Sequence, residues 1–383
     1  MDLKLTEEQI LIKSNARRFF EKEIAPLVDE YEYAKKPITR DIVKKLVPFG
    51  YIGGQLPEES GGFGLDSLTY FLMIEELARA WPSLRAMTSI SNSVLTNIYE
   101  YGTGEQRKEF VEPLLRVEKI GFSAITEPNV GSDAASIETT ATLKGDRWVI
   151  NGTKMFISNG MEGDLGIVIA QTDKSKGIDG IARFIVEKGK QNYLARPIEK
   201  MGNHCSPIAE LVFEDCELPR ENLLGEVGQG LKVGLKALNK ARIQIAFICS
   251  GIAQACVDLS VKYARERVQF GKPIGSFQLI QAKIADMLTQ TSAMRLLGYQ
   301  AACLLGENMP CVVEASMAKM YSSEAVLKVA DQAIQIHGGY GYSREFPLER
   351  YYRDARHLAI AEGTNEIQRL IIGRKVIGIS AFK

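Results

Sequence analysis

A glutamate near the C-terminus has the sequence surroundings of a catalytic base. Glu362 stands directly before Gly363 and a Thr-Asn pair, and Ile367 then opens a helical apolar spacing. Thr364 is therefore predicted to cap a helix. Glu362 is predicted to lie outside that helix, on a backbone that Gly363 allows to take conformations closed to other residues. Such a carboxylate can project into a cleft and remove a proton. The alternative is an acidic side chain that interacts only with the positive helix end, worth about one kcal/mol or less.

A second segment is rich in hydrogen-bond donors. Residues 122–133, with the sequence FSAITEPNVGSD, combine hydroxyl side chains with a glycine. Hydroxyl and backbone N–H groups of this kind suit the edge of a planar, electron-rich ring and the oxygens of a phosphate. The alternative is a turn-rich loop without a ligand.

Three arginines are candidates for binding an anion. Arg85 lies among small, weakly polar residues, and Arg242 lies in a helical pattern, so each alone reads as a solvated helix-surface charge. Arg267 precedes a turn at Gly271, where a basic residue offsets the helix dipole and the glycine ends the helix.

A glycine motif favours a rival class, the nicotinamide-dependent dehydrogenases. Residues 228–234, GQGLKVG, resemble a dinucleotide fingerprint before a helix. However, the preceding residues 218–224, LPRENLL, make a poor strand, and no strand-ending acid follows about 20 residues on. We therefore interpret these glycines as a turn into the next domain.

The elements that must position these residues fall into three regions. Thr6 to Gln9 form a capping box, and amphipathic helical spacing continues to Pro26. Further helical patterns lead to the prediction of an all-helical domain over residues 1–117; they lie at residues 42–47, 68–80 and 106–115.

The middle of the chain changes to a strand-like period. Asn151-Gly152, between two strand-forming runs, predicts a hairpin. With the later runs it predicts a β-barrel or sandwich over residues 118–226; those runs lie at residues 165–171, 181–186 and 209–213. Helical patterns at residues 231–263, 280–305 and 313–335 then predict a domain like a four-helix bundle over residues 227–383. The expected fold class is α+β.

Composition excludes some classes of partner. Lys plus Arg and Asp plus Glu are both 47, so no net charge attracts nucleic acid, and no run of about 18 apolar residues predicts membrane insertion. The six cysteines form no C-x-x-C pair, which favours reduced thiols and a cytoplasmic location. His337 has no second metal ligand at helical or strand spacing, so it is predicted to be a packing residue.

Several of these motifs together resemble the acyl-CoA dehydrogenase family. Residues 361–369, AEGTNEIQR, are similar to the family's catalytic-base segment, and residues 122–133 to its flavin segment. The resemblance extends from the first helix to Arg374. It implies a helical–β–helical fold, FAD as cofactor, a homotetramer, and Glu362 as the base that removes the α-proton of an acyl-CoA thioester. It further implies that flavin N5 accepts the β-hydride, that the Glu362 backbone N–H and a flavin ribityl hydroxyl hold the thioester oxygen, and that an electron-transferring flavoprotein takes the electrons.

The same resemblance implies roles for other residues by position. Ile125 and Thr126 would meet the pyrimidine side of the isoalloxazine, Phe156 would pack against the ring, and Ser158 would bond its N5 edge. Arg267 would reach the flavin pyrophosphate of a neighbouring subunit, so that a monomer could not complete the site. The remaining expected cofactor contacts are Gln269, Phe270, Gln335, Gly338, Gly339, Thr364 and Glu366, and the remaining expected substrate contacts are Ser132, Arg242 and Gly363.

The substrate prediction depends on Arg85. Its segment is similar to that of glutaryl-CoA dehydrogenases, where an arginine holds the distal carboxylate of the substrate. The glutamate and the bulky aromatic of the decarboxylating enzymes are replaced by Ala78 and Ala361. A short, branched, cyclic or dicarboxylic acyl chain is therefore expected. An acyl-CoA oxidase, an enoyl-CoA reductase and a flavoprotein that binds nucleic acid without dehydrogenase activity are the alternatives.

Overall fold

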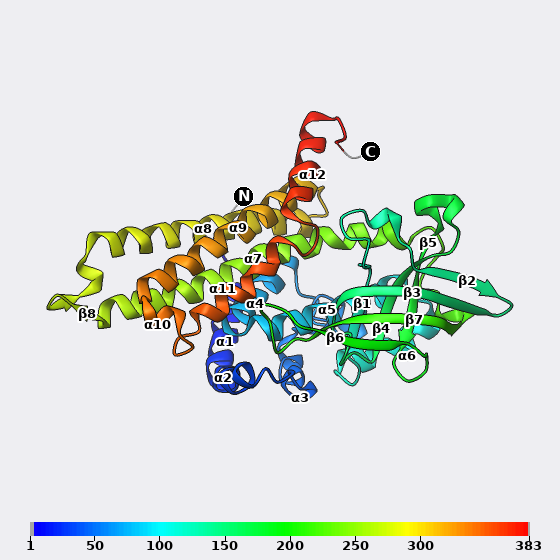
Figure 1. Cartoon of the computed structure of the whole chain (residues 1–383), viewed down its shortest axis with the longest axis horizontal. Coiled ribbons are helices and arrows are strands. Elements are labelled where there is room, and N and C mark those ends of the chain that lie inside the picture. The colour runs from blue at the N-terminus through cyan, green and yellow to red at the C-terminus, as the bar shows by residue number, and fades with distance from the viewer. Residues whose placement is uncertain (1–3, 382–383) are drawn as a thin grey trace.

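The computed structural model describes residues 4–381 and has helices at both ends of the sequence and a sheet in its middle (Figure 1). The first helix begins at the predicted capping box: Thr6 Oγ1 accepts from Gln9 N, and Gln9 Oε1 accepts from Thr6 N, both at 3.1 Å. The expected end at Pro26 is wrong. The α-helical hydrogen bonds are interrupted by a π-helical turn at Phe20–Ile24. Pro26 then lies in the first turn of the next helix, where its missing N–H is not needed.

The N-terminal region contains six α-helices. They are α1 (Glu7–Phe19), α2 (Ala25–Ala34), α3 (Arg40–Lys44), α4 (Ser67–Ala80), α5 (Pro82–Tyr101) and α6 (Gly104–Leu115). Helix α5, which carries Arg85, begins with a proline at its first position and is largely buried. Its length did not follow from the sequence pattern.

The middle region is one curled, seven-stranded sheet. Its strands are β1 (Gly121–Ala124), β2 (Thr140–Lys144), β3 (Arg147–Ser158), β4 (Leu165–Gln171), β5 (Ile181–Glu187), β6 (Leu194–Ile198) and β7 (Ile208–Pro219). The order is β1-β4-β2-β3-β7-β6, and β5 pairs with β4. Every residue of β4 and β5 is buried, so both faces of these strands are covered, as their near-continuous apolar sequence indicates.

The predicted hairpin at Asn151-Gly152 is wrong. These two residues lie inside the single strand β3, where the register against β7 shifts between Ile150 and Gly152, as in a β-bulge. Gly152 is needed there because a Cβ would lie 2.5 Å from Thr139 Oγ1. The turn between β2 and β3 is instead made at Gly145, whose φ of 64° favours glycine.

The C-terminal helices share one hydrophobic core with the N-terminal ones. The elements are α7 (Gly230–Glu266), α8 (Gln278–Gly306), α9 (Val312–His337), α10 (Gly339–Tyr342), α11 (Leu348–Arg356) and α12 (Asn365–Ile377), with the short strands β8 (Val268–Gln269) and β9 (Lys272–Pro273). Helices α4 and α7 cross closely, and the rings of Phe71 and Phe247 lie 5.3 Å apart at this contact. Helix α7 is long and apolar enough to cross a membrane, but its apolar stretch is mostly buried, as in a core helix.

Figure 1 shows the arrangement that matters for the site. The β8–β9 hairpin and α10 lie at one end of the molecule, the sheet lies at the other, and α12 projects from the side between them. Division of the chain near residues 117 and 226 stays a proposal.

Candidate active site

Glu362 lies in a strained turn between two helical elements. Its φ is 58°, a left-handed conformation that is uncommon for a residue with a side chain, and Gly363 follows with a φ of 87°. Thr364 caps α12 as predicted, because its Oγ1 accepts from Ile367 N at 3.4 Å. The prediction that Glu362 lies outside the helix is therefore confirmed. The unusual backbone conformation was expected at Gly363 alone, but Glu362 also has a positive φ.

The Glu362 carboxyl lies among three basic side chains. Burial raises its pKa, while Arg85, Arg242 and Lys319 oppose that rise. A carboxylate with a raised pKa and no ion pair within 4 Å in the described part of the chain is a better base than a solvated one.

The backbone of the turn is fixed through its carbonyl oxygens. The Glu362 oxygen accepts from Arg242 Nε at 3.2 Å and from Gln368 Nε2 at 3.3 Å. The Gly363 oxygen accepts from Gln368 Nε2 and from Lys319 Nζ, both at 2.9 Å. In contrast, the N–H of Glu362 has no acceptor within the described residues. That N–H is free to donate to a ligand.

Arg242 is not the solvated surface charge that its sequence context suggests. It is 5% exposed, and its Nη1 atom donates to Asn239 Oδ1 at 3.1 Å. Together with its hydrogen bond to the Glu362 carbonyl oxygen, this burial means that Arg242 is in direct contact with the turn.

Arg85 is also buried, with 9% of its surface exposed. Its Nε atom is buried without a partner, and no hydrogen bond or ion pair of its guanidinium occurs within residues 4–381. Burial lowers the pKa of Arg85 to about 10, and Glu362, Cys249 and Asp354 oppose this effect. The side chain is thus charged at neutral pH but has no anionic partner of its own.

Two titratable residues near Arg85, one buried and one half-buried, were missed by the sequence patterns. Asp354 on α11 is fully buried, and its Oδ1 accepts from Asn203 N at 2.5 Å. His357 follows it, and burial together with Arg85 lowers the pKa of His357 to about 3. The His357 imidazole is therefore neutral at neutral pH, and it lies near the Arg85 guanidinium. The amphipathic spacing of α11 was the available signal, since Asp354 falls on its buried face.

The end of β3 presents an aromatic ring to solvent. Phe156 has a φ of 59° and is 57% exposed. Met155 N donates to Thr126 O at 2.8 Å, so the segment that holds Ile125 and Thr126 lies beside this ring. Ser158 follows at the end of the strand. Strain and exposure at one aromatic residue fit a planar ligand such as a flavin, which would stack on it.

This strand end is tied to the helix that carries Arg85. Asn159 Nδ2 donates to Met87 O on α5 and to Gly121 O on β1, both at 2.9 Å. The flavin segment is in turn held by a buried ion pair, in which Lys154 Nζ donates to Glu127 Oε1 at 2.7 Å and to Ile125 O at 2.9 Å.

Three further predicted residues, Ser132, Thr364 and Glu366, are exposed or half-buried. Ser132 and Glu366 are exposed, and hydrogen bonds to Glu366 N and to Thr364 hold the pKa of the Glu366 carboxyl below its usual value. Thr364 and Glu366 line a hollow of about 310 Å³ together with Arg356 and Ile360. This hollow leaves room for part of a ligand next to two of the expected cofactor contacts.

The other predicted cofactor residues lie at the end of the molecule away from the sheet. Arg267, Gln269 and Phe270 belong to the β8–β9 hairpin, and Gln335, Gly338 and Gly339 join α9 to α10 (Figure 1). The guanidinium of Arg267 lies 5.7 Å from the centre of the Tyr340 ring, which connects the two segments. The structure therefore divides the predicted site into a near set around Glu362 and a far set around Arg267.

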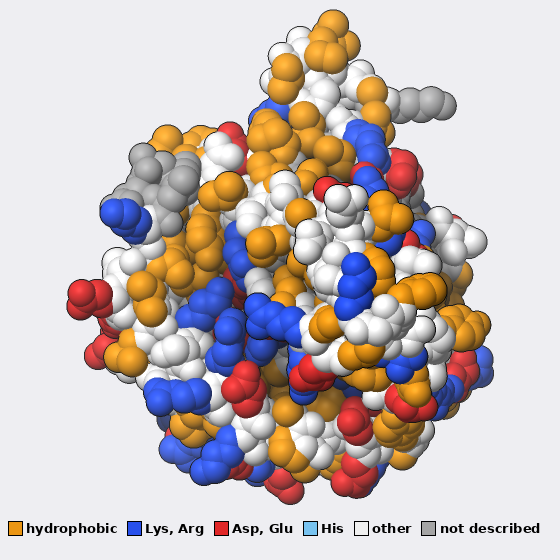
Figure 2. Space-filling view, turned by 90° about the vertical axis from the view of Figure 1, so that its left-hand side faces the viewer, with side chains coloured by type: hydrophobic (Ala, Val, Ile, Leu, Met, Phe, Trp, Pro, Cys, Tyr) orange, Lys and Arg blue, Asp and Glu red, His pale blue; other side chains and the backbone are white. Residues whose placement is uncertain are grey.

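Every residue of the far set is exposed, and Phe270 is 94% exposed. Two apolar side chains outside the set, Tyr342 and Leu279, are also strongly exposed. Figure 2 faces this end and shows hydrophobic side chains over it, with Lys and Arg side chains gathered near its centre. His337 beside this set is buried and stacks on Tyr263 with ring centres 4.1 Å apart, as expected of a packing residue.

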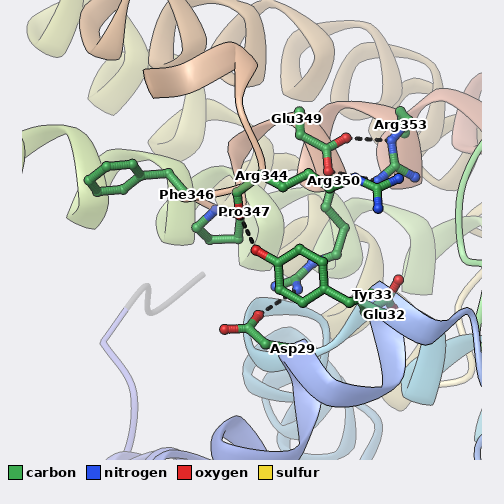
Figure 3. A pocket seen from close by; sticks show the side chains of 9 residues that line it. All are labelled: Asp29, Glu32, Tyr33, Arg344, Phe346, Pro347, Glu349, Arg350 and Arg353. Carbon is green, nitrogen blue, oxygen red and sulfur yellow. Dashed lines mark hydrogen bonds and ion pairs between the residues drawn. The ribbon is translucent and has the colours of Figure 1, made fainter. Parts of the chain in front are cut away.

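A separate, small hollow lies where α2 meets the start of α11 (Figure 3). Its arginines are balanced by carboxylates: Arg353 pairs with Glu349 at 2.6 Å, and Arg350 with Asp29 at 3.4 Å. Because these charges balance, the hollow favours neither an anionic nor a cationic ligand. None of the predicted site residues lines this hollow. No group of His, Cys, Asp and Glu side chains among the described residues is arranged to hold a metal ion.

Models of three protein-family domains match the chain. They are described as acyl-CoA dehydrogenase N-terminal domain, middle domain and C-terminal domain, and they match residues 6–118, 123–216 and 228–377.

Curated relatives match over almost the whole chain. The acryloyl-CoA reductase (NADH) of Anaerotignum propionicum is 42% identical over 98% of this chain and 96% of its own length. The mitochondrial short-chain specific acyl-CoA dehydrogenase of Mus musculus is 42% identical over 97% of this chain and 90% of its own length.

Solved structures have the same fold. One described as an electron transferring flavoprotein of Acidaminococcus fermentans, with a view to flavin-based electron bifurcation, has a matching chain with a TM-score of 0.94 at 43% identity. That match covers 98% of this chain and all of the other. A glutaryl-coenzyme A dehydrogenase in complex with glutaryl-CoA matches with a TM-score of 0.95 at 37% identity, over 99% and 97% of the two chains.

Proposed function

The chain belongs to the acyl-CoA dehydrogenase family, and on that premise we propose that Glu362 is the base of an acyl-CoA α,β-dehydrogenation. Enzymes of the family are FAD-dependent oxidoreductases that act on a CH–CH bond. The observation that carries the assignment is the strained turn at Glu362, with a carboxyl of raised pKa and a free backbone N–H.

In the proposed reaction the Glu362 carboxylate takes the α-proton of the thioester. The N–H of Glu362 donates to the thioester oxygen, where negative charge develops as the proton leaves. Bound FAD supplies the acceptor for the hydride that leaves the β-carbon, so that the product is the 2-enoyl-CoA. Bound substrate and cofactor would exclude water from the half-buried Glu362 and strengthen both interactions.

The near set of residues is proposed to hold the reactive part of the cofactor. The exposed ring of Phe156 offers a stacking surface, Ser158 a hydroxyl, and the 125–126 segment its backbone. Thr364 and Glu366 lie at the adjoining hollow. Ser132, Arg242 and Gly363 are proposed contacts of the substrate or its coenzyme A part.

The far set is proposed to complete the cofactor site of a second copy. Support comes from the position of the β8–β9 hairpin and α10 at the end of the molecule away from the sheet (Figure 1) and from the exposure of Phe270. Helix α8 also exposes apolar side chains that a second copy would cover, among them Leu279, Leu288 and Leu296. A homotetramer is the proposed assembly.

The proposed substrate is a short acyl-CoA, and a dicarboxylic one such as glutaryl-CoA fits best. An unpaired, buried guanidinium is unfavourable by several kcal/mol unless an anion joins it, and Arg85 has no such anion within 4 Å among residues 4–381. Ala78 is buried on α4 without adding a polar group, and Ala361 adds no bulk beside Glu362. The similar structure with bound glutaryl-CoA supports the same substrate class.

The reverse direction, enoyl-CoA reduction, is the second candidate, because one relative is named an acryloyl-CoA reductase. An oxidase would share the active site and differ in reducing oxygen. The proposed electron acceptor is an electron-transferring flavoprotein, which the similar Acidaminococcus fermentans structure supports. The proposed location is the cytoplasm, which suits six free cysteines.

An anaerobic titration of the purified holoenzyme tests the proposal. Butyryl-, isovaleryl-, glutaryl- and cyclohexanecarbonyl-CoA are added singly while the flavin absorbance is followed. Bleaching by one of them, with formation of its 2-enoyl-CoA, is the expected result. A preparation without flavin would contradict the proposal. Bleaching by NADH, followed by reoxidation with an enoyl-CoA, would instead favour the reductase, and peroxide formed in air would favour the oxidase.

A further inference from the structure

A fully buried lysine lies under the turn that carries Glu362. Lys319 on α9 is 0% exposed. Its ammonium group donates to Ala359 O at 3.1 Å, Gly363 O at 2.9 Å and Asn365 Oδ1 at 2.8 Å. We propose that Lys319 is the positioning residue that holds the catalytic turn and its carboxylate in the reactive geometry. This inference rests on the proposed role of Glu362.

The geometry of the three bonds is the first argument. An ammonium group has three N–H donors, and all three are used within residues 359–365. Two acceptors are backbone oxygens that lie on either side of Glu362 in the sequence. Lys319 therefore bridges the start and the end of the turn.

The absence of an ion pair is the second argument. Lys319 has no carboxylate within 4 Å in the described part of the chain, so only neutral acceptors offset the burial of its charge. Lys154 is equally buried but is paired with Glu127. An unpaired buried charge is costly, and a purely structural support for the turn would not require one.

The strain of the turn is the third argument. Glu362 and Gly363 both have positive φ values, and such conformations persist only when surrounding contacts fix them. Arg242 and Gln368 hold the Glu362 oxygen, and Lys319 together with Gln368 holds the next one. Without Lys319, the Gly363 end of the turn keeps only the Gln368 amide.

The charge of Lys319 also acts on Glu362. Charged and titratable groups face the ammonium from each element packed around it; they are Cys249 and Arg242 on α7, His357 before the turn, Glu362 within it and Glu366 on α12. Burial lowers the pKa of Lys319 to about 8, and its positive charge opposes the burial-driven rise in the pKa of Glu362. A neutral residue at this position would leave the Glu362 carboxyl harder to ionise.

The test compares Lys319→Met with a matched control, Lys200→Met. Lys200 is also a lysine whose ammonium donates to backbone oxygens, those of Asn203 and Ser206, but it does not act on Glu362. Both variants are prepared as FAD-loaded holoenzymes. The pH profile of kcat/KM and the hydrogen–deuterium exchange of residues 359–365 are measured for each.

We expect Lys319→Met to lower kcat by about 10- to 100-fold, because a base misplaced by about 1 Å loses that much. The acid limb of its pH profile should move to higher pH, and exchange in residues 359–365 should rise. Lys319→Arg, which keeps the charge, should return the acid limb toward that of the wild type. Lys200→Met should change neither the limb nor that exchange.

Unchanged exchange of residues 359–365 in Lys319→Met would overturn the positioning role, and an unchanged acid limb would overturn the electrostatic part. If Lys319→Met does not fold, Asn365→Ala removes one of the three acceptors and keeps the Lys319 charge, so exchange in residues 359–365 should rise to a smaller extent while the acid limb stays. If no acyl-CoA bleaches the wild-type flavin, the proposed function fails separately, and the exchange measurement still tests whether Lys319 holds the turn.

Discussion

The Nε atom of Arg242 lies 3.2 Å from the backbone carbonyl oxygen of Glu362. This contact joins the longest helix of the chain, α7, to the residue proposed as the base. Arg242 also lowers the pKa of Glu362 against the effect of burial. One side chain therefore acts on both the backbone and the ionisation of Glu362.

Replacing Arg242 should therefore affect two properties together. Arg242→Leu removes the hydrogen bond and the charge, so kcat/KM should fall about 10- to 100-fold, as for the loss of a charged hydrogen bond. The acid limb of the pH profile should move to higher pH. Arg242→Lys, which keeps the charge without the Nε donor, should move the limb less. A variant that weakens only coenzyme A binding would raise KM with kcat and the limb unchanged.

The assignment of the base is tested by Glu362→Gln. The amide keeps the shape of the side chain but cannot accept the α-proton, so flavin bleaching should slow by at least about 10²-fold. FAD should remain bound, as followed by its absorbance. Glu345→Gln, the same change at an exposed carboxylate, is the control. Near-full activity in Glu362→Gln would mean that another group removes the proton.

The pH dependence of the wild type follows from the same carboxyl. Because burial raises the pKa of Glu362, the base is protonated and inactive at low pH, and kcat/KM should rise as the pH passes through this raised pKa. The midpoint should lie above about 4.3, the ordinary value for glutamate. Steady-state rates at fixed ionic strength, measured from below about pH 4.3 to pH 9, locate the midpoint, and a midpoint at or below about 4.3 would contradict the prediction.

The role of Arg85 is tested with two substrates of similar length. Arg85→Ala should lower kcat/KM for glutaryl-CoA by about 10- to 100-fold, because a buried carboxylate loses its charged hydrogen bonds. The same variant should affect butyryl-CoA much less. Equal losses for both substrates would assign Arg85 a structural role.

Some structural features could be predicted from the sequence, and others could not. Thr364 could be recognised as a helix cap because a threonine before an apolar helical spacing depends only on neighbours in sequence. The long helical and strand patterns were recognised for the same reason. Asn151-Gly152 was misread, because an Asn-Gly pair suits a bulge inside a long strand as well as a hairpin turn, and only the pairing of β3 with β7 decides between them.

The buried charges could not be read from local patterns. Arg85 looks like a surface arginine, but it is buried on α5, and the groups near it, among them Cys249 and Asp354, are distant in sequence. The sequence contains a weak indication that Lys319 is buried. It falls on the same helical face as three residues that are buried, Ala315, Ser322 and Val326. A lysine on an apolar face is unusual, but its acceptors in residues 359–365 appear only in three dimensions.

Asp354 should make the stability of the protein depend on pH. Burial and the charge of Glu32 raise the pKa of Asp354 to about 7, against about 3.9 in an unfolded chain. The folded state thus holds the proton more tightly, so its contribution to stability is present below about pH 4 and is lost as the pH rises through 7.

Asp354→Asn removes this titration and keeps the oxygen that accepts from Asn203 N. Relative to the wild type, the variant should gain up to a few kcal/mol of unfolding free energy between pH 5 and 8. Denaturant unfolding at several pH values measures this. A difference between the two proteins that does not change with pH would contradict the prediction.

The division of the site into a near and a far set can be tested by mixing two inactive chains. If each cofactor site takes Glu362 from one copy and Arg267 from another, then Glu362→Gln and Arg267→Ala chains should complement each other. In a mixed pair, one site carries both substitutions and the other carries neither. Random pairing leaves about half of the pairs mixed and should restore about a quarter of the wild-type activity, whereas mixed pairs purified alone should restore about half.

The two variants are co-expressed with different affinity tags and purified through both, so that only mixed assemblies remain. Arg267→Ala alone should lose FAD on dilution, while Glu362→Gln alone should keep it. Mixing two copies that both carry Glu362→Gln is the control and should restore nothing. Mixed assemblies without activity, although both tags are present and flavin is bound, would mean that Arg267 does not serve the neighbouring site and that its exposed hairpin has another role.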